Sequence, residues 1–369
     1  TTDVLTIRCP PQGFHSRALQ VSAAPMADGG WFERVLATVF ADTPFLKGGS
    51  ADYVLAACLA LCFPIVRAIM DRTVHETVAC WALKVPAYKK SDDRPKELEE
   101  TKTKFKESLY KAEAQAVLTF FLLLVVTHHK WAFDTRLFWS ECYQLPCLAP
   151  MSLGERFIYC LELGFYLQAL PILFVWETKR KDRLEVAAHH VATILLIAYS
   201  YYLNLTRVGI MVLACHELND VFLESAKMAR YARHETSTTV FFATFALSWF
   251  VSRIYVFPVY VIRSTLIDAK HYGRVFDVNI EPHYSILNGF LIFLLVLHMY
   301  WSYLIVRIIV GQLRHGEIQD VREEEEAAAA GGPAAHTRHA EEVAAKLVDQ
   351  TLAGSRGNEP NVTSIPGST

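Results

Sequence analysis

Long apolar stretches alternate along the chain with short segments that are rich in charged residues. About twenty apolar residues are enough for a helix to cross the hydrocarbon core of a bilayer. Seven stretches approach or exceed that length, although the first is short and the fifth carries several acidic residues: residues 52–70, 113–133, 157–176, 187–204, 207–226, 238–263 and 284–311. The pattern predicts an all-α, polytopic membrane protein with about seven transmembrane helices.

The charged segments between these stretches differ in their content of Lys and Arg. Segments 71–112, 177–186 and 227–237 are rich in basic residues, whereas the segments that alternate with them hold few. Basic loops stay on the cytosolic side of a membrane. With seven spans, this alternation predicts that the N-terminus lies in a lumen and the C-terminus in the cytosol.

The same pattern divides the chain into four parts. Residues 1–50 are predicted to form a lumenal segment, and residues 1–30 lack the pattern of a signal peptide. Residues 51–112 hold the first transmembrane helix and a basic cytosolic loop, and residues 113–312 hold the other six helices. Residues 313–369 are acidic, rich in Ala and Gly and poor in large apolar side chains, so we predict a mostly disordered cytosolic tail.

Composition supports a membrane protein and excludes several other classes. Hydrophobic residues make up 52% of the chain, and the mean hydropathy is +0.21, which is high for a soluble protein of this length. The net charge of −2 provides no field that would attract nucleic acid. The eight Cys form no CxxC pair, so neither a zinc ribbon nor a disulfide scaffold is indicated. Cys142 and Cys147 share one loop and are able to pair if that loop is lumenal.

Polar residues of the fourth apolar stretch gather on one side of the predicted helix. At roughly 100° per residue, with His189 at zero, Ser200 falls near 20°, Thr193 near 40°, Asn204 near 60° and His190 near 100°. The remaining surface is mostly Val, Ile, Leu and Ala. The helix therefore carries one polar wedge.

The fifth stretch carries a second wedge. With His216 at zero and roughly 100° per residue, Lys227 falls near 20°, Asp220 near 40°, Glu224 near 80° and Glu217 near 100°. Asp220 is four residues after His216, which is the spacing at which helical side chains meet. We therefore expect Asp220 to orient the His216 imidazole and Glu217 to be a secondary group.

The two wedges are expected to form one pocket. The link between the stretches is short, around residues 205–206, so the helices are antiparallel neighbours. Pairing about this turn places Asp220 level with Thr193 and Glu224 level with His189. The predicted pocket lies in the cytosolic half of the membrane.

Some of these polar residues have an explanation in packing or solvation and need no functional role. A single membrane His is often a hydrogen-bonded packing residue, and Glu224 and Lys227 are near enough to a helix end to extend to the interface. Each buried charge, however, costs at least ~2.5–3.5 kcal/mol on insertion scales. A whole set of ionisable groups on two facing wedges therefore favours a functional site.

Three kinds of chemistry fit such a site to different degrees. The sequence HELND at 216–220 is similar to the zinc motif HExxH, but Asp220 replaces the second His. A di-iron site needs several His boxes, and only one adjacent His pair, His189-His190, lies at a suitable depth. A His beside a carboxylate is a competent general base near neutral pH. We therefore predict acid–base or nucleophilic chemistry without a metal.

The same residues form a spaced signature that resembles that of the ceramide synthases, within the TLC domain family. The family pattern is a basic run with Lys-Asp, then HH, SYxxNxxRxG, HDxxD and LExxK. The corresponding positions are Lys181-Asp182, His189-His190, Ser200-Tyr201, Asn204, Arg207, Gly209, His216, Asp220, Leu223-Glu224 and Lys227. More distant positions also resemble the family, in its sixth helix and last span: Trp249, Arg253, Pro258, Asn288, His298 and Trp301. The resemblance covers residues 104–311, and it departs at Glu217, where the family usually has Asp.

The resemblance implies both a fold and a reaction. The fold would be a TLC-type helical barrel that encloses a polar pocket in the endoplasmic reticulum membrane. The reaction would transfer a fatty acyl group from acyl-CoA to the amine of a sphingoid long-chain base. Implied partners are these two substrates, the bilayer and a further copy or another subunit, with no nucleic acid and no cofactor apart from acyl-CoA as co-substrate. A non-enzymatic TLC-domain protein that binds or senses lipids is the alternative.

Site residues follow from the wedges and the resemblance together. The predicted catalytic residues are His189, His190, His216 and Asp220. The predicted supporting residues are Glu217, Glu224, Thr193, Ser200 and Asn204. Basic side chains at the cytosolic rim are candidates to bind CoA phosphates, unless they serve only to set the topology: Lys179, Arg180, Lys181, Arg183 and Lys227.

Overall fold

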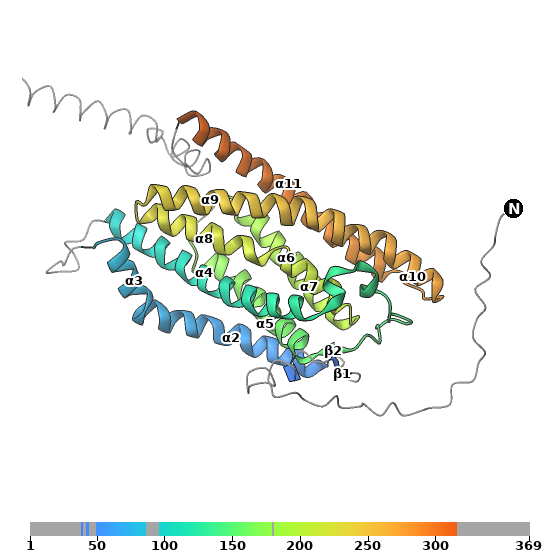
Figure 1. Ribbon diagram of the computed structural model, residues 1–369. Coiled ribbons are helices and arrows are strands. Elements are labelled where there is room, and N and C mark those ends of the chain that lie inside the picture. The colour runs from blue at the N-terminus through green and yellow to red at the C-terminus, as the bar shows by residue number, and fades with distance from the viewer. Residues whose placement is uncertain (1–37, 40–41, 44–48, 86–95, 179–180, 316–369) are drawn as a thin grey trace, which may run out of the picture. The chain divides into compact units, whose positions relative to one another are not determined.

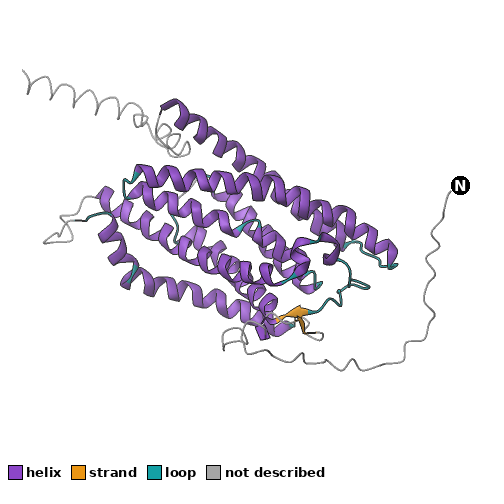
Figure 2. Ribbon diagram, viewed as in Figure 1, coloured by secondary structure: helices purple, strands orange, loops and turns teal. Residues whose placement is uncertain are grey.

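The computed structural model describes residues 38–39, 42–43, 49–85, 96–178 and 181–315. Three predictions fall wholly or mainly outside these residues: the lumenal segment 1–50, the tail 313–369, and a role for Lys179 and Arg180. Nearly all the described residues belong to one compact unit, Phe40–Thr369. They are almost entirely helical, which confirms the all-α prediction (Figures 1 and 2).

Six helices of the described part are long and apolar enough to cross a membrane. They are α2 (Ser50–Thr73), α4 (Lys96–His128), α5 (Leu153–Val175), α6 (Arg183–Tyr202), the continuous helix Glu235–Val275 and α11 (His283–His315). The helix Glu235–Val275 consists of α9 (Glu235–Trp249), the π-helical segments η4 (Phe250–Ile262) and η5 (Ser264–Asp268), and α10 (Ala269–Val275). These helices match six of the seven predicted stretches, so the chain is a multi-pass membrane protein.

The fifth predicted stretch is two helices rather than one. α7 (Thr206–Ala214) ends before Cys215, and α8 (Glu217–Tyr231) begins after His216. Side chains bind the carbonyls at this break: Arg253 Nη2 donates to the His216 carbonyl at 2.8 Å, and Asn219 Nδ2 donates to the Cys215 carbonyl at 3.1 Å. The single helix predicted over 207–226 is therefore wrong, and a seventh span is not confirmed.

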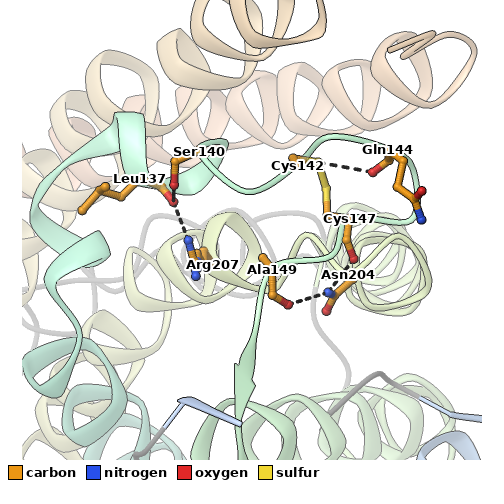
Figure 3. Close-up of a disulfide and its surroundings, with 8 residues drawn as sticks. All are labelled: Leu137, Ser140, Cys142, Gln144, Cys147, Ala149, Asn204 and Arg207. Atoms are coloured by element: carbon orange, nitrogen blue, oxygen red, sulfur yellow. Dashed lines mark hydrogen bonds between the residues drawn. A yellow bond between two sulfur atoms is a disulfide. The ribbon is translucent and has the colours of Figure 1, made fainter. Parts of the chain in front are cut away.

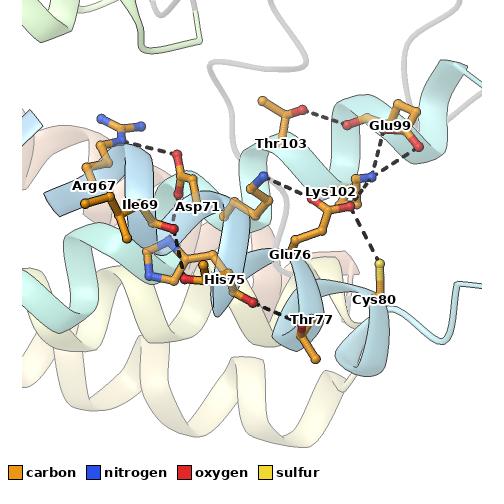
Figure 4. Close-up of polar contacts among 12 residues, drawn as sticks. Arg67, Ile69, Asp71, His75, Glu76, Thr77, Cys80, Glu99, Lys102 and Thr103 are labelled. Carbon is orange, nitrogen blue, oxygen red and sulfur yellow. Dashed lines mark hydrogen bonds and ion pairs between the residues drawn. The ribbon is translucent and has the colours of Figure 1, made fainter. Parts of the chain in front are cut away.

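The basic segment 71–112, predicted as a loop, is mostly helical where it is described. It holds the end of α2, the short helix α3 (His75–Ala82) and the first turns of α4. Glu76 of α3 accepts a hydrogen bond from Lys102 at 2.7 Å (Figure 4). It accepts another from Lys106 at 3.0 Å. Burial opposes the ionisation of Glu76, but these two bonds outweigh it and hold the pKa of Glu76 below its usual value. These ion pairs join α3 to α4, so the charged side chains of this segment are used in packing two helices together.

A short disulfide-closed loop lies before α5. Cys142 and Cys147 are bonded, and Asn204 donates to the carbonyls of Cys147 at 2.8 Å and Ala149 at 2.9 Å (Figure 3). The amide of Asn204 therefore holds this loop in place, and its predicted role in supporting the pocket stays a prediction. Two-residue strands, β1 (Asp42–Thr43) and β2 (Met151–Ser152), pair antiparallel beside the loop.

The helices pack around a buried centre and expose apolar side chains outward. Tyr159, Phe257 and Leu294 are almost fully buried, whereas Leu61 is 72% exposed and Leu247 is 69% exposed. Exposed aliphatic side chains on spanning helices are expected at a lipid boundary. We call the end of the bundle where α5 ends and α6 begins the basic end, and the opposite end the disulfide end.

Candidate active site

Among the described residues, those of the predicted site line two cavities inside the helical bundle. The polar chamber, of about 240 Å³, is nearer the basic end, and its lining includes Arg67, Lys111, His189, Asp220, Lys227 and Arg253. The apolar chamber, of about 100 Å³, is nearer the disulfide end, and its lining includes Cys142, Leu196, Val208, His216, Leu291 and Leu294. Tyr166 of α5 lines both. The two chambers therefore approach each other at the depth of the predicted site.

Three imidazoles from three parts of the chain meet between the chambers. The ring of His189 on α6 lies 6.1 Å from that of His216, which in turn lies 4.8 Å from that of His298 on α11. Trp301 packs edge-on against His189 at 5.6 Å. His189 lines the polar chamber and His216 lines the apolar chamber. A reacting group held at this cluster would have polar surroundings on one side and apolar surroundings on the other.

The hydrogen bonds of His216 determine its tautomer. Nδ1 of His216 bonds to the Val212 carbonyl, which can only accept, so Nδ1 carries the hydrogen. Nε2 of neutral His216 is then an acceptor, and it lies 3.0 Å from Nε2 of His298. His298 must therefore donate from Nε2, which leaves its Nδ1 without a hydrogen. Both ring nitrogens of His216 are engaged.

His189 differs from His216 in this respect. Within the described residues its ring donates and accepts no hydrogen bond, although its side chain is buried and lines the polar chamber. Its backbone carbonyl accepts a hydrogen bond from Thr193 Oγ1 at 2.9 Å. The hydroxyl of Thr193, a predicted supporting residue, is therefore bound to the backbone of its own helix. Unlike His216, His189 therefore has no hydrogen bond from a described residue that a substrate would have to displace. His190 packs against the ring of Tyr166 at 5.6 Å.

Asp220 reaches the cluster through Arg253. Arg253, in η4, donates from Nη2 to Asp220 Oδ1 at 3.1 Å and to the His216 carbonyl at 2.8 Å. Its guanidinium also lies over the ring of Trp249 at 4.3 Å. The prediction that Asp220 orients the His216 ring directly is not supported, because the ring nitrogens have other partners. Asp220 instead holds the arginine that binds the backbone at the helix break.

A pair of buried carboxyl groups lies behind Tyr166. Glu217 is 1% exposed and accepts from Tyr166 Oη at 3.0 Å through Oε1, while its Oε2 has no hydrogen-bond partner among the described residues. Glu162 of α5 is fully buried, neither of its oxygens has a partner within the described residues, and it interacts electrostatically with Glu217. Two charged carboxylates in one buried place repel each other. Tyr166 connects this pair to both chambers.

The remaining supporting residues are distributed between the chambers. Ser200 lies 3.2 Å from Tyr159 Oη and lines the apolar chamber. The close approach of this tyrosine requires Gly209, since a Cβ at that position would meet Tyr159 Oη at 1.7 Å. Glu224 pairs with Lys227 at 2.7 Å, and both line the polar chamber.

Only some of the cations predicted to bind CoA line the polar chamber. Lys227 lines it, but neither Lys181 nor Arg183 is among the described residues that do. Arg183 instead lies over the ring of Phe174 at 5.9 Å. Arg67, Lys111 and Arg230 line the chamber, and the sequence pattern did not indicate them.

Several site residues were missed because they come from distant segments. Arg253, His298 and Trp301 stood out only as positions of family resemblance, and Glu162 and Tyr166 lie in an apolar stretch that gave no signal. A charged residue in the middle of such a stretch, as at Glu162, is the sign that would have indicated a buried role.

Among the described residues no group of three or more His, Cys, Asp and Glu is placed to hold a metal ion. The absence of a metal from the reaction stays a prediction.

Comparison with known proteins gives a consistent picture. The TLC domain model matches residues 104–307. Ceramide synthase LOH2 of Arabidopsis thaliana is 35% identical over 277 residues, which cover 73% of this chain and 90% of the relative. ASC1-like protein 3 of Oryza sativa subsp. japonica is 32% identical over 74% of this chain and 95% of its own length. Ceramide synthase 5 of Homo sapiens is 31% identical over 65% of this chain and 57% of its own length. These matches confirm the resemblance found in the sequence, and the chain belongs to the TLC domain family.

Proposed function

We propose that the protein is a ceramide synthase, which transfers a fatty acyl group from acyl-CoA to the amine of a sphingoid long-chain base. The observation that supports this proposal most strongly is the cluster of His189, His216 and His298 between a polar and an apolar chamber. Relatives that carry the name ceramide synthase are consistent with it. The location would be the endoplasmic reticulum membrane, with the N-terminus in the lumen and the basic end toward the cytosol.

The two chambers suit the two halves of an acyl thioester. The polar chamber is lined by cations such as Lys111, Lys227 and Arg253, and it would receive the phosphates of CoA. The apolar chamber is lined by Leu, Ile and Val side chains and would receive the acyl chain. The thioester carbonyl would then lie at the imidazole cluster, beside His189.

In the proposed reaction His189 is the nucleophile. Its ring nitrogen attacks the thioester carbonyl, the carbon–sulfur bond breaks, and CoA leaves as a thiolate. The amine of the base then attacks the acyl-imidazole, the amide forms, and His189 is released. The base enters as an ammonium and loses two protons in all: one goes to the CoA sulfur and the other to solvent.

His216 is the proposed base that takes a proton from the amine. Of the two ring nitrogens of His216, Nε2 carries the lone pair, and it accepts the hydrogen bond from His298. That bond must open for the proton to be accepted. Arg253 and Asp220 are positioning residues in this scheme, because they hold the backbone carbonyl of His216. The scheme needs no cofactor.

The test is an assay of the purified full chain in lipid nanodiscs with palmitoyl-CoA and sphinganine, followed by mass spectrometry. We expect one dihydroceramide for each free CoA released. Omission of sphinganine should leave an acyl group on the protein, detected as a mass increase that His189→Ala lacks. A wild-type protein that binds these lipids but forms no amide would support the non-enzymatic alternative and refute the proposal.

A further inference from the structure

Arg67 of α2 is a buried cation on the wall of the polar chamber. Its side chain is 3% exposed, and it lies outside the residues that match the TLC domain model. The rings of Tyr110 on α4 and Trp176 after α5 pack against its guanidinium, with Cζ 4.8 Å from each ring centroid. Two aromatic contacts hold the guanidinium plane in place.

The described part of the chain offers the Arg67 guanidinium no hydrogen-bond acceptor. A guanidinium has five N–H donors, yet within the described residues Arg67 donates no hydrogen bond, and its Nε is buried without a partner. The nearest carboxylate oxygen, Oδ2 of Asp71, lies 3.8 Å from Nε, which is beyond hydrogen-bond distance (Figure 4). Asp71 itself bonds to His75 at 2.7 Å. Buried donors in this state are rare in folded proteins and point to a missing acceptor.

Three other cations that line the chamber donate hydrogen bonds to carboxylates. Lys111 donates to Glu107 and Glu177, and Lys227 donates to Glu224. Arg253 donates to Asp220. Arg67 differs from these three because its ion pair with Asp71, at 3.8 Å, is too long for a hydrogen bond, and no other acceptor among the described residues takes its donors at the chamber wall.

We propose that Arg67 binds a phosphate group of acyl-CoA. This inference rests on the proposed function, since acyl-CoA is the phosphate-bearing substrate of that reaction. Phosphate offers several acceptor oxygens on one group, which matches the paired donors of a guanidinium better than a single carbonyl does. The first membrane helix, which lies outside the matched domain, thereby becomes part of the substrate site.

The test compares two substrates and two proteins in nanodiscs of neutral lipid. Palmitoyl-CoA carries phosphates, and S-palmitoyl-pantetheine has the same thioester without them. With wild type we expect kcat/KM to fall when the phosphates are removed. With Arg67→Gln, kcat/KM for palmitoyl-CoA should fall roughly 10- to 100-fold, as expected for the loss of hydrogen bonds to a charged group, and kcat/KM for S-palmitoyl-pantetheine should change little. The KM for sphinganine should not move.

Two further variants separate binding from folding. Arg67→Lys keeps the charge but loses the planar donor pair, so it should restore only part of the loss. Arg72→Gln is the matched control, because Arg72 is exposed on the same helix and does not line the polar chamber. It should behave like wild type with both substrates. Thermal unfolding of each variant shows whether it is folded, and binding of free CoA to wild type and Arg67→Lys gives a measurement that does not require turnover.

The outcomes separate this inference from the proposed function. If wild type forms no amide from palmitoyl-CoA, the proposed function is wrong. Suppose that wild type is active and that the Arg67→Gln protein is folded. If the substitution then lowers kcat/KM equally for both thioesters, Arg67 does not bind a CoA phosphate. A dependence on Arg67 that appears only when phosphatidic acid is added to the nanodiscs would identify a lipid headgroup as the ligand and would also refute the proposal.

Discussion

We expect Asp220 and Arg253 to be energetically coupled in their effects on kcat/KM. A measured coupling would show that Asp220 acts on His216 through Arg253. The sequence indicated a direct contact between Asp220 and the His216 ring, whereas the structure places Arg253 between Asp220 and the His216 backbone. The perturbation is a double-mutant cycle of Asp220→Asn, Arg253→Met and the double variant. Methionine approximates the length of the arginine stem and removes both donated bonds.

The magnitude follows from the contact and its exposure. One charge-assisted hydrogen bond of 3.1 Å joins a side chain that is 5% exposed, on Arg253, to one that is 35% exposed, on Asp220. A hydrogen bond to a charged group contributes about 1.5–3 kcal/mol, and exposure of the carboxylate reduces this through solvent screening. We expect a coupling of about 1–2 kcal/mol, which corresponds to roughly 5- to 30-fold in kcat/KM.

The assay measures kcat/KM of all four proteins with palmitoyl-CoA, together with their thermal unfolding. Each single variant should be impaired, and the double variant should be less impaired than the product of the two single effects. Each single effect includes the penalty of leaving the other partner unpaired, and the double variant removes both partners. Single effects that combine without coupling, within about 0.5 kcal/mol, would show that Asp220 does not act through Arg253.

Four other predictions concern the site. His189→Ala should lower turnover by roughly 100-fold or more while membrane insertion stays normal, measured by kcat in nanodiscs; near wild-type turnover would rule out His189 as nucleophile. Gly209→Ala should lower the unfolding temperature, because its Cβ would meet the hydroxyl of Tyr159, and adding Tyr159→Phe should restore part of the loss; no restoration would contradict the clash. Glu217→Gln should lower kcat/KM less than Asp220→Asn does, because an amide oxygen can still accept from Tyr166; pH–rate profiles of both variants provide the comparison, and the reverse order would show that the Glu217 charge matters more. Strong chelators should not inhibit the reaction, and pure protein should contain far less than one equivalent of metal. Stoichiometric zinc or iron, with activity lost when the metal is removed, would support a metalloenzyme mechanism instead.

The spans and part of the site could be predicted because they depend on local patterns. Apolar length determines which segments enter a bilayer, and helical periodicity places His189 and His216 on facing wedges, in agreement with the contact between their rings. The positions of these two residues needed only one short turn between neighbouring helices. No such local rule relates His216 to His298, which are 82 residues apart.

Other features depend on tertiary contacts that a linear pattern does not contain. The segment 71–112 looked like a basic loop because its charge content is high, yet ion pairs such as Glu76–Lys102 link α3 to α4 across 26 residues. Asn204 fits the polar wedge by angle, but its amide is used by carbonyls of the disulfide loop. Angle around a helix places a side chain on a face; the partner that it meets there is decided by the neighbouring segments.

The break between α7 and α8 accounts for the acidic residues that the bilayer would otherwise disfavour. An unbroken helix over 207–226 would carry Glu217, Asp220 and Glu224 at a cost that increases with each ionised group. With the break at His216, α8 is a separate helix that packs between α4 and α9. Its three carboxyl groups, in chain order, accept hydrogen bonds from Tyr166, Arg253 and Lys227. The same break leaves backbone carbonyls that Arg253 and Asn219 must bind. A buried arginine is thereby required beside His216 for structural reasons alone, so loss of Arg253 should impair folding as well as turnover, and the coupling with Asp220 should appear in both measurements.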